Sequence, residues 1–411
     1  MLNYISVLDS NTKSNQTSLP VDYINYDLIA GVDALEVLNV DSDSFIALQN
    51  FYNKHNDWLF GYLSYDLKNE VEQLTSNNDD GIKANSLSFF IPRYVLLLKG
   101  NTLEIQSYES KGDCQQFLAY QQLNWNDDSN AIQLKQRDTK AKYLEKIGVI
   151  KKHIQRGDIY EVNYCQEFFS EQVILNPQQV FLELNTNAQT PFASFLKLND
   201  LHIMCASPER FIRKSGNRII SQPIKGTRKR GRNLAEDKIL IKEFIESEKE
   251  ISENVMIVDL VRNDLSITAS KASVNVKELC GIYTFKKVHQ MISTISSKVD
   301  DKINVIQILK SIFPMGSMTG VPKLRAMELI EQLEEFKRGI FSGAIGYITP
   351  KGDFDFNVVI RTILYNASTK YLSVAVGGAI TIKSNANEEY EECLIKVRPI
   401  FEVLNFQCDE K

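Results

Sequence analysis

Two pairs of glutamates are the first candidates for chemistry in this sequence. Glu250 and Glu253 are three residues apart in one stretch of helical periodicity, and Glu389 and Glu392 repeat that spacing in another. Side chains at this spacing share one face of a helix, so each pair can present both carboxylates together. Carboxylate oxygens are ligands that Mg²⁺ prefers in proteins. The pairs therefore predict a Mg²⁺ site, with solvated helix faces as the alternative.

A lysine between a proline and a glycine is the second candidate. In residues 223–231, Pro223 stiffens the turn and Gly226 lets the backbone approach a ligand closely, so Lys225 is placed to project into a site. Burial beside apolar groups or other cations would make its amine lose its proton more readily, and a neutral amine acts as a nucleophile or base. A surface lysine in a loop is the simpler alternative.

Two further segments indicate anion binding. Residues 314–323 form a glycine-bearing loop that leads into a helix N-terminus, where free N–H groups favour an anion. The loop has neither Walker A nor GxGxxG spacing, so a carboxylate fits better than a nucleotide, and an ordinary capped loop is the alternative. In residues 353–365, strand alternation places Arg361 on the face opposite the aromatic residues. There it predicts a bidentate carboxylate clamp or, alternatively, a surface ion pair.

Composition narrows the class of protein. The chain has 411 residues, 43% of them hydrophobic and 24% charged, which is typical of a globular protein with a large core. A net charge of −5 gives no reason to expect a nucleic acid or an anionic membrane as partner. The first residues lack the pattern of a signal peptide, and no run of 18 apolar residues occurs. These features predict a cytoplasmic protein whose six scattered cysteines are reduced.

The elements that must position these residues are predicted to mix helices and antiparallel strands. Strands are expected at residues 86–100 and 102–110 and again within 341–382. Helices are expected at residues 140–156, as one long helix at 235–260, after Pro322, and at 387–397. The pattern lacks regular βαβ alternation, so the predicted class is α+β. A polar stretch at residues 124–130 predicts a boundary between a strand-rich part, 1–130, and a catalytic part, 131–411.

Six motifs carry a resemblance to a known family. ASPERF (206–211), PIKGT (223–227), ENVMIVDLVRNDL (253–265), PMGSMTGVPKLRAME (314–328), FSGAIGY (341–347) and EEYEECLIK (388–396) follow one another in this order. Their order and spacing resemble the chorismate-binding enzymes, densely from residue 157 to 397 and more thinly at GYLSYDLK (61–68). The resemblance implies two large, mostly antiparallel β-sheets packed face to face, with helices outside and Mg²⁺ as the cofactor.

Within that family, a lysine in PIKGT resembles the aminodeoxychorismate synthase branch. The resemblance implies that Lys225 attacks chorismate at ring C2 while the C4 hydroxyl leaves. Ammonia then enters at C4 and displaces the lysine, giving 4-amino-4-deoxychorismate for para-aminobenzoate and folate biosynthesis. Glu209 of ASPERF matches the general acid that protonates the leaving hydroxyl, which requires a carboxyl group with a raised pKa. The alternatives are anthranilate synthase component I and then an isochorismate or salicylate synthase.

The same resemblance assigns the remaining site residues. Glu253 and Glu392 match the Mg²⁺ ligands, with Glu250 and Glu389 as supporting carboxylates. Arg361 and the Gly377 backbone match the clamp on the enolpyruvyl carboxylate, and Lys396 matches a further active-site lysine. The other residues assigned to substrate binding are Gly226, Thr227 and Thr319.

The sequence departs from the family pattern at three other positions. Glu161 stands where the aminating members usually have glutamine. Gln290 stands where many members have histidine, and His289 comes one residue earlier. Phe341 replaces a tyrosine.

The nitrogen source follows from what the cysteines lack. Glutamine hydrolysis by an amidotransferase needs a nucleophilic cysteine supported by a histidine. No cysteine of this sequence lies on the glycine-flanked elbow that such enzymes use. The resemblance therefore implies a separate glutamine amidotransferase subunit, and free ammonia as the nitrogen source of the isolated chain.

Overall fold

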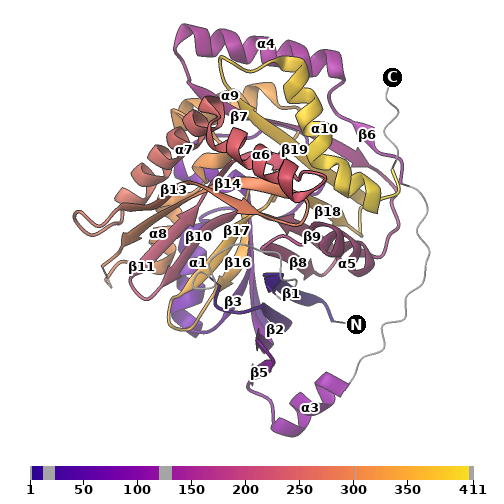
Figure 1. Cartoon of the computed structure of the whole chain (residues 1–411). Coiled ribbons are helices and arrows are strands. Elements are labelled where there is room, and N and C mark those ends of the chain that lie inside the picture. The colour runs from indigo at the N-terminus through magenta and orange to yellow at the C-terminus, as the bar shows by residue number, and fades with distance from the viewer. Residues whose placement is uncertain (1, 13–23, 120–131, 301, 407–411) are drawn as a thin grey trace.

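The fold is α+β, as the sequence predicts, and every ladder between its strands is antiparallel (Figure 1). The computed structural model describes residues 2–12, 24–119, 132–300 and 302–406. The strands are β1 Tyr4–Asp9, β2 Leu28–Val40, β3 Leu59–Leu63, β4 Leu87–Lys99, β5 Thr102–Ser107, β6 Lys135–Gln136, β7 Glu161–Ser170, β8 Phe192–Leu198, β9 Leu201–Ser207, β10 Arg210–Ser215, β11 Arg218–Gln222, β12 Ile224–Lys229, β13 Asn275–Thr284, β14 Val288–Lys298, β15 Gly320–Val321, β16 Ala344–Ile348, β17 Phe354–Val358, β18 Thr362–Asn366 and β19 Tyr371–Ile380. The helices are α1 Ser44–His55, α2 Lys68–Val71, α3 Lys111–Ala119, α4 Lys140–Arg156, α5 Pro177–Ala188, α6 Leu234–Ile245, α7 Glu248–Ser266, α8 Val305–Ile312, α9 Lys323–Leu333 and α10 Ala386–Val403, with short 3₁₀ turns η3 Tyr65–Leu67 and η4 Gly316–Met318.

The strands form two sheet halves that are joined through β2 and β4. One half runs β7–β19–β18–β9–β8–β1, and the other runs β3–β16–β17–β10–β11–β14. Side chains from both halves meet in one hydrophobic core, for example Cys205 of β9, Ile212 of β10 and Ile345 of β16. This shared core confirms the predicted packing of antiparallel sheets against each other.

The outer face of the first half is covered by helices. Along β9, Ile203 and Cys205 point into the shared core, whereas Met204 and Ala206 point to a second core under α4, α5, α9 and α10. This period of two is what a strand buried on both faces requires. Figure 1 shows α4 and α10 over this layer, and α6 and α7 beside β13 and β14.

Several local predictions are confirmed. Helix α4 begins after Thr139, whose side chain accepts a hydrogen bond from the backbone N–H of Lys142, and it ends at Gly157 in the left-handed conformation. Strands β4 and β5 are joined by the turn at Gly100. The last predicted helix is observed as α10.

The single helix predicted at residues 235–260 is wrong. The chain forms α6, leaves the helical conformation at Ser247, and begins again as α7. The break lets α6 pack on β13 while α7 lies along β12 and β14. Apolar periodicity alone did not show it, because both helices carry a similar pattern.

The continuous strand predicted at residues 353–365 is also wrong. Strand β17 pairs with β16 and β10, whereas β18 pairs with β9 and β19. Residues 359–361 therefore carry the chain from one sheet half to the other. Arg361 lies in this crossing segment with a φ of 54°, so it is not on a strand face.

The two predicted parts of the chain share strand pairings. Strand β1 pairs with β8, and β3 pairs with β16, so strands from residues 1–130 are built into ladders with strands from 131–411. The polar stretch 124–130 and the boundary near residue 130 lie outside the described residues, and the boundary stays a prediction. In the part of the chain that the structure describes, no helix is both long and apolar enough to cross a membrane.

Candidate functional site

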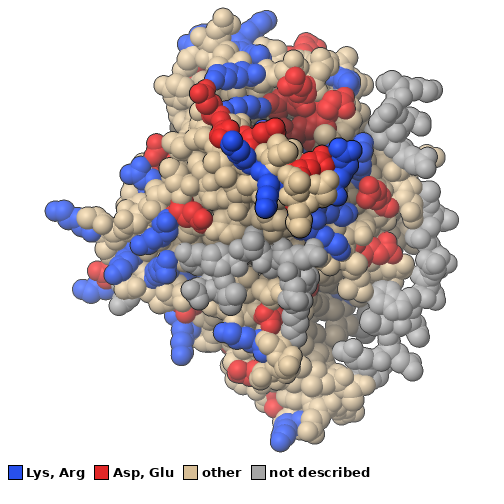
Figure 2. Space-filling view, viewed as in Figure 1, with Lys and Arg blue, Asp and Glu red and all other residues tan. Residues whose placement is uncertain are grey.

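A cavity of about 960 Å³ brings together most of the residues that the sequence singles out. Strands β12 and β19, helices α7 and α10, and the segment that crosses between the sheet halves contribute to its wall. Figure 2 shows acidic side chains gathered in a hollow beside α10, with basic side chains near its rim. The predicted site residues on the wall are Glu209, Lys225, Gly226, Thr227, Glu250, Glu253, Arg361, Gly377, Glu389, Glu392 and Lys396.

Lys225 is buried on the cavity wall and is paired with a carboxylate. Its Nζ lies 2.7 Å from Oε1 of Glu161, and the two side chains are 9% and 1% exposed. Burial alone would lower the pKa of Lys225, but attraction and a hydrogen bond from Glu161, together with Glu253 and Glu209, raise it. The expectation that burial leaves this amine ready to lose its proton is therefore wrong. The resting side chain is an ammonium ion held by Glu161.

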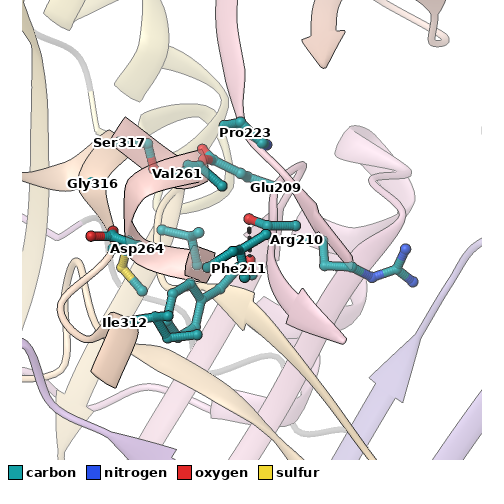
Figure 3. A pocket seen from close by; sticks show the side chains of 13 residues that line it. Glu209, Arg210, Phe211, Pro223, Val261, Asp264, Ile312, Gly316 and Ser317 are labelled. Atoms are coloured by element: carbon teal, nitrogen blue, oxygen red, sulfur yellow. Dashed lines mark hydrogen bonds between the residues drawn. The ribbon is translucent and has the colours of Figure 1, made fainter. Parts of the chain in front are cut away.

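Glu209 has the raised pKa that a general acid near neutral pH needs. Burial raises the pKa of its carboxyl group to about 7, although a hydrogen bond with Ser317 and the charge of Lys225 oppose the change. Figure 3 shows Glu209 and Ser317 next to each other at a small pocket, while Arg210 points away from that pocket. The Arg210 guanidinium instead donates to Asp355, from Nε to Oδ1 at 2.9 Å and from Nη2 to Oδ2 at 3.0 Å.

The four predicted metal-site glutamates line this cavity from α7 and α10. Burial raises the pKa of Glu253 to about 7 and also raises the pKa values of Glu250 and Glu389. At Glu392 burial acts in the same direction, but Lys396, Lys249 and Lys225 together outweigh it and the pKa is lowered. The cluster therefore gathers more negative charge than its surroundings readily hold.

Two lysines balance that charge. Lys249 Nζ lies 4.0 Å from Glu253 and 3.8 Å from Glu389, and Lys396 Nζ lies 2.6 Å from Glu392. Across the described ranges, no three Asp, Glu, His or Cys residues form a ready-made metal cage. The donors nevertheless suit a hard cation, which binds a few carboxylates and retains water molecules. A divalent ion between the helices would supply the counter-charge that the lysines provide here.

Arg361 and Gly377 lie on the wall where a carboxylate clamp is predicted. Burial lowers the pKa of Arg361 against the attraction of Glu392, and no hydrogen bond or ion pair of its side chain is found within the described residues. Its backbone is fixed, because its carbonyl oxygen accepts a hydrogen bond from Ala206 at 3.1 Å. At Gly377, a Cβ atom would lie 2.3 Å from the Tyr164 carbonyl oxygen, so only glycine fits there. Lys396 donates to the Gly377 carbonyl oxygen at 3.0 Å.

The remaining predicted substrate residues differ in their placement. Gly226 has a φ of 88°, and a Cβ there would lie 2.6 Å from Oε2 of Glu250. Thr227 is exposed on the cavity wall. Thr319 is fully buried, its hydroxyl donates to the Gly316 carbonyl oxygen at 3.1 Å, and it is not on that wall. The structure does not bring Thr319 to the cavity, and its substrate-binding role stays a prediction.

The departures from the family pattern have distinct surroundings. Gln290 and Phe341 line the cavity, and the Gln290 Oε1 atom is buried with no hydrogen-bond partner among the described residues. His289 is fully buried, and its Nε2 lies 3.0 Å from Asp237. His289 therefore does not take the place of the histidine that Gln290 replaces.

Sequence reasoning missed a buried ion pair that binds two residues of the cavity wall, Asn163 and Met318. Arg338 donates to Glu334 at 2.6 and 2.9 Å and to the carbonyl oxygens of Asn163 and Met318, each at 2.7 Å. Glu334 Oε1 also accepts from the Cys165 backbone N–H at 2.8 Å. The pair thus fixes β7 against the loop that carries Ser317. The i, i+4 spacing of Glu334 and Arg338 is the only signal of this pair in the sequence. Exposed ion pairs have the same spacing, so it does not show that the pair is buried.

We expect Glu334→Ala to lower the free energy of unfolding by about 3–5 kcal/mol, because it leaves the Arg338 charge buried and unpaired. Urea denaturation measures the change. The matched control is Glu335→Ala, since Glu335 is 42% exposed and its pairs with Lys142 and Lys146 contribute about 1 kcal/mol or less. Equal losses in the two variants would contradict a structural role for the buried pair.

Comparison with known proteins places these residues in a family. The family model for chorismate binding enzyme matches residues 13–402. Aminodeoxychorismate synthase component 1 of Escherichia coli K12 is 33% identical over 347 residues, which cover 84% of this chain and 76% of that protein. Aminodeoxychorismate synthase of Streptomyces griseus is 38% identical over 265 residues, 64% of this chain but 36% of the relative. The chain thus spans about a third of that longer protein.

A solved structure has the same fold. Anthranilate synthase component I of Streptococcus pneumoniae TIGR4 matches with a TM-score of 0.81 at 23% identity, over 90% of this chain and 91% of the other. The chain belongs to the chorismate-binding enzyme family.

Proposed function

We propose that this chain is a transferase that aminates chorismate at C4 to give 4-amino-4-deoxychorismate. The observation that carries the proposal is Lys225, a buried amine on the wall of the cavity that also holds Glu209. The names of the relatives, aminodeoxychorismate synthase, support the same reaction. The product would serve para-aminobenzoate and folate biosynthesis.

The proposed mechanism has two substitutions through a covalent lysine adduct. Lys225 forms a bond to ring C2 while the C4–O bond breaks, and Glu209 gives its proton to the leaving oxygen. Ammonia then forms the bond at C4 while the bond to lysine breaks. Dividing one difficult substitution in this way lowers each barrier. A carboxyl group with a pKa of about 7 is partly protonated at neutral pH, as the first step requires.

The charges on the wall orient the substrate in this proposal. Arg361 and the Gly377 backbone bind the enolpyruvyl carboxylate, and Lys396 is a further active-site lysine beside them. Glu253 and Glu392, supported by Glu250 and Glu389, would hold Mg²⁺, which when bound supplies positive charge for the ring carboxylate. With Mg²⁺ bound, Lys249 and Lys396 would neutralise less of the charge of these glutamates.

A glutamine amidotransferase subunit is the proposed partner. The relative in Escherichia coli is named component 1, which is consistent with a second component. On its own, the chain would use ammonium as its nitrogen source.

Product analysis tests the function. The purified chain is incubated with chorismate, Mg²⁺ and ammonium, and the products are separated by chromatography. Aminodeoxychorismate needs an added lyase to yield 4-aminobenzoate, whereas anthranilate appears directly and isochorismate forms without a nitrogen source. Anthranilate or isochorismate as the main product would contradict the proposal. Glutamine-dependent amination by the isolated chain would contradict the need for a partner.

We expect Glu253→Gln and Glu392→Gln each to weaken Mg²⁺ binding in the presence of chorismate, because each removes a charged oxygen from the proposed site. Calorimetric titration measures this independently of turnover. Glu391→Gln is the matched control, since Glu391 is half exposed on α10 and pairs with Lys140 at 2.8 Å. If both variants bound Mg²⁺ like the wild type, the metal site would be wrong.

A further inference from the structure

Glu161 lies behind Lys225 as seen from the cavity. Lys225 is on the cavity wall, whereas Glu161 at the start of β7 is 1% exposed and is not on it. The main chain of Glu161 is fixed by its pairing with Val321 of β15. Glu161 therefore contacts the amine without reaching a substrate in the cavity, and any effect on the reaction passes through Lys225.

The Glu161 carboxylate has one oxygen engaged and one spare. Oε1 lies 2.7 Å from Lys225 Nζ, and Oε2 is buried without a hydrogen-bond partner in the described part of the chain. A buried carboxylate oxygen that accepts no hydrogen bond is costly. Oε2 therefore keeps an open acceptor position on the carboxylate that already holds the Lys225 amine.

The other carboxylates that face Lys225 are more distant. Glu209 precedes β10, Glu253 lies on α7 and Glu392 lies on α10. Among the described residues, Glu161 is the one whose carboxylate lies within 4 Å of Lys225 Nζ. The amine must lose a proton before it can form a bond to carbon, and its raised pKa opposes that loss at neutral pH.

We propose that Glu161 is the proton acceptor for Lys225: it holds the ammonium ion at rest and takes its proton when the amine attacks. This rests on the proposed function. The proton moves from Nζ to the Glu161 carboxylate, and the freed lone pair forms the N–C2 bond. Both ring double bonds shift by one position toward C4, the C4–O bond breaks, and the oxygen leaves as water with the proton of Glu209.

The second substitution restores the starting state. Ammonium returns a proton to Glu209 and attacks C4 as ammonia. The electron pair of the N–C2 bond goes back to Nζ, and Lys225 recovers its proton from Glu161. The balance is chorismate plus ammonium giving the protonated amine and water, with nothing oxidised or reduced. Transfer within the buried pair exchanges two charged groups for two neutral ones, which burial favours.

The first measurement needs no turnover. Acetic anhydride acylates neutral amines, so the labelling of Lys225 at a series of pH values, followed by peptide mass spectrometry, gives the pH at which its amine becomes neutral. We expect Glu161→Gln to move that half-point down by about 1–3 pH units, as the loss of an adjacent opposite charge does. Glu161→Asp restores a carboxylate and should move the half-point back. Glu167→Gln is the matched control, because Glu167 is a buried carboxylate of the same strand whose partners are Arg137, Tyr371 and Ser373.

The second measurement is amination by the same purified full-length variants. The loss of a proton acceptor should lower kcat of Glu161→Gln by about 10²-fold or more with a small change in KM. An unchanged labelling half-point in Glu161→Gln would overturn the proposal, and so would a shifted half-point with unchanged kcat. If the wild type made no aminated product, the proposed function would be wrong. The labelling comparison would still decide whether Glu161 controls the charge of Lys225.

Discussion

Lys225→Ala should lower chorismate amination by roughly 10⁴-fold or more, the order of effect expected when a covalent nucleophile is removed. Chorismate binding in the presence of Mg²⁺ should change little, because Arg361, Lys396 and the glutamates of α7 and α10 remain. Steady-state kinetics and calorimetry measure the two effects separately. Mass spectrometry of the wild type quenched during turnover should detect an adduct on Lys225 that the variant lacks.

The control for this variant addresses folding. Lys225→Ala leaves the Glu161 charge buried and unpaired, which by itself destabilises a protein. The double variant Lys225→Met with Glu161→Gln removes both charges and keeps similar volumes, so its melting temperature should be closer to that of the wild type. An inactive but stable double variant would separate chemistry from folding. Steady-state turnover by Lys225→Ala at the wild-type rate would show that the lysine is not the nucleophile.

The sequence indicated which glutamates lie together on each helix, but it did not indicate the backbone around Arg361. Helical spacing places Glu250 beside Glu253 on α7 and Glu389 beside Glu392 on α10, and that spacing can be read directly. The meeting of the two pairs in one cavity depends on how the helices pack. The position of Arg361 could not be read in this way. Alternation assumes a continuous strand, and the chain instead changes sheet halves at residues 359–361. Such a change depends on which strands pair, and pairing is set by contacts far away in the sequence.

The pKa of Lys225 could not be predicted from the sequence for the same reason, because its partner Glu161 is distant in the sequence. The two residues are 64 positions apart, on strands that do not pair with each other. The sequence predicted that Lys225 projects into a site and that burial would lower its pKa. That pKa depends on the partner as well as on burial, and the partner reversed the direction. For Glu209 no partner outweighs burial, so its pKa is raised, as the role of a general acid requires.

The ion pair of Glu334 and Arg338, which the sequence did not indicate, supports the surroundings of Lys225 and Glu209. It ties β7, which carries Glu161, to the loop that carries Ser317. Because Ser317 contacts Glu209 and Glu161 contacts Lys225, one buried pair supports the positions of both partners. The sequence does not show the contact of Ser317 with Glu209 or that of Glu161 with Lys225, because both are tertiary contacts.

Glu209→Gln should lower amination by about 10²- to 10⁴-fold, the usual contribution of a general acid, because an amide of the same shape cannot supply the proton. The pH profile gives the sharper evidence. With a pKa of about 7, the wild-type rate should fall as the pH rises through about 7 and Glu209 loses its proton. That alkaline limb should be absent in Glu209→Gln.

A second variant tests whether this alkaline limb belongs to Glu209, and it leaves the carboxyl group in place. Ser317 hydrogen-bonds to Glu209 and lowers its pKa, so Ser317→Ala should raise that pKa and move the alkaline limb to higher pH. Ser221→Ala is the matched control, since Ser221 lines the same small pocket but donates to the Phe211 carbonyl oxygen at 2.7 Å. Rate measurements from pH 5 to 9, about two units on each side of that pKa, would show both effects. An alkaline limb that persists in Glu209→Gln, or that stays in place in Ser317→Ala, would mean that another group supplies the proton.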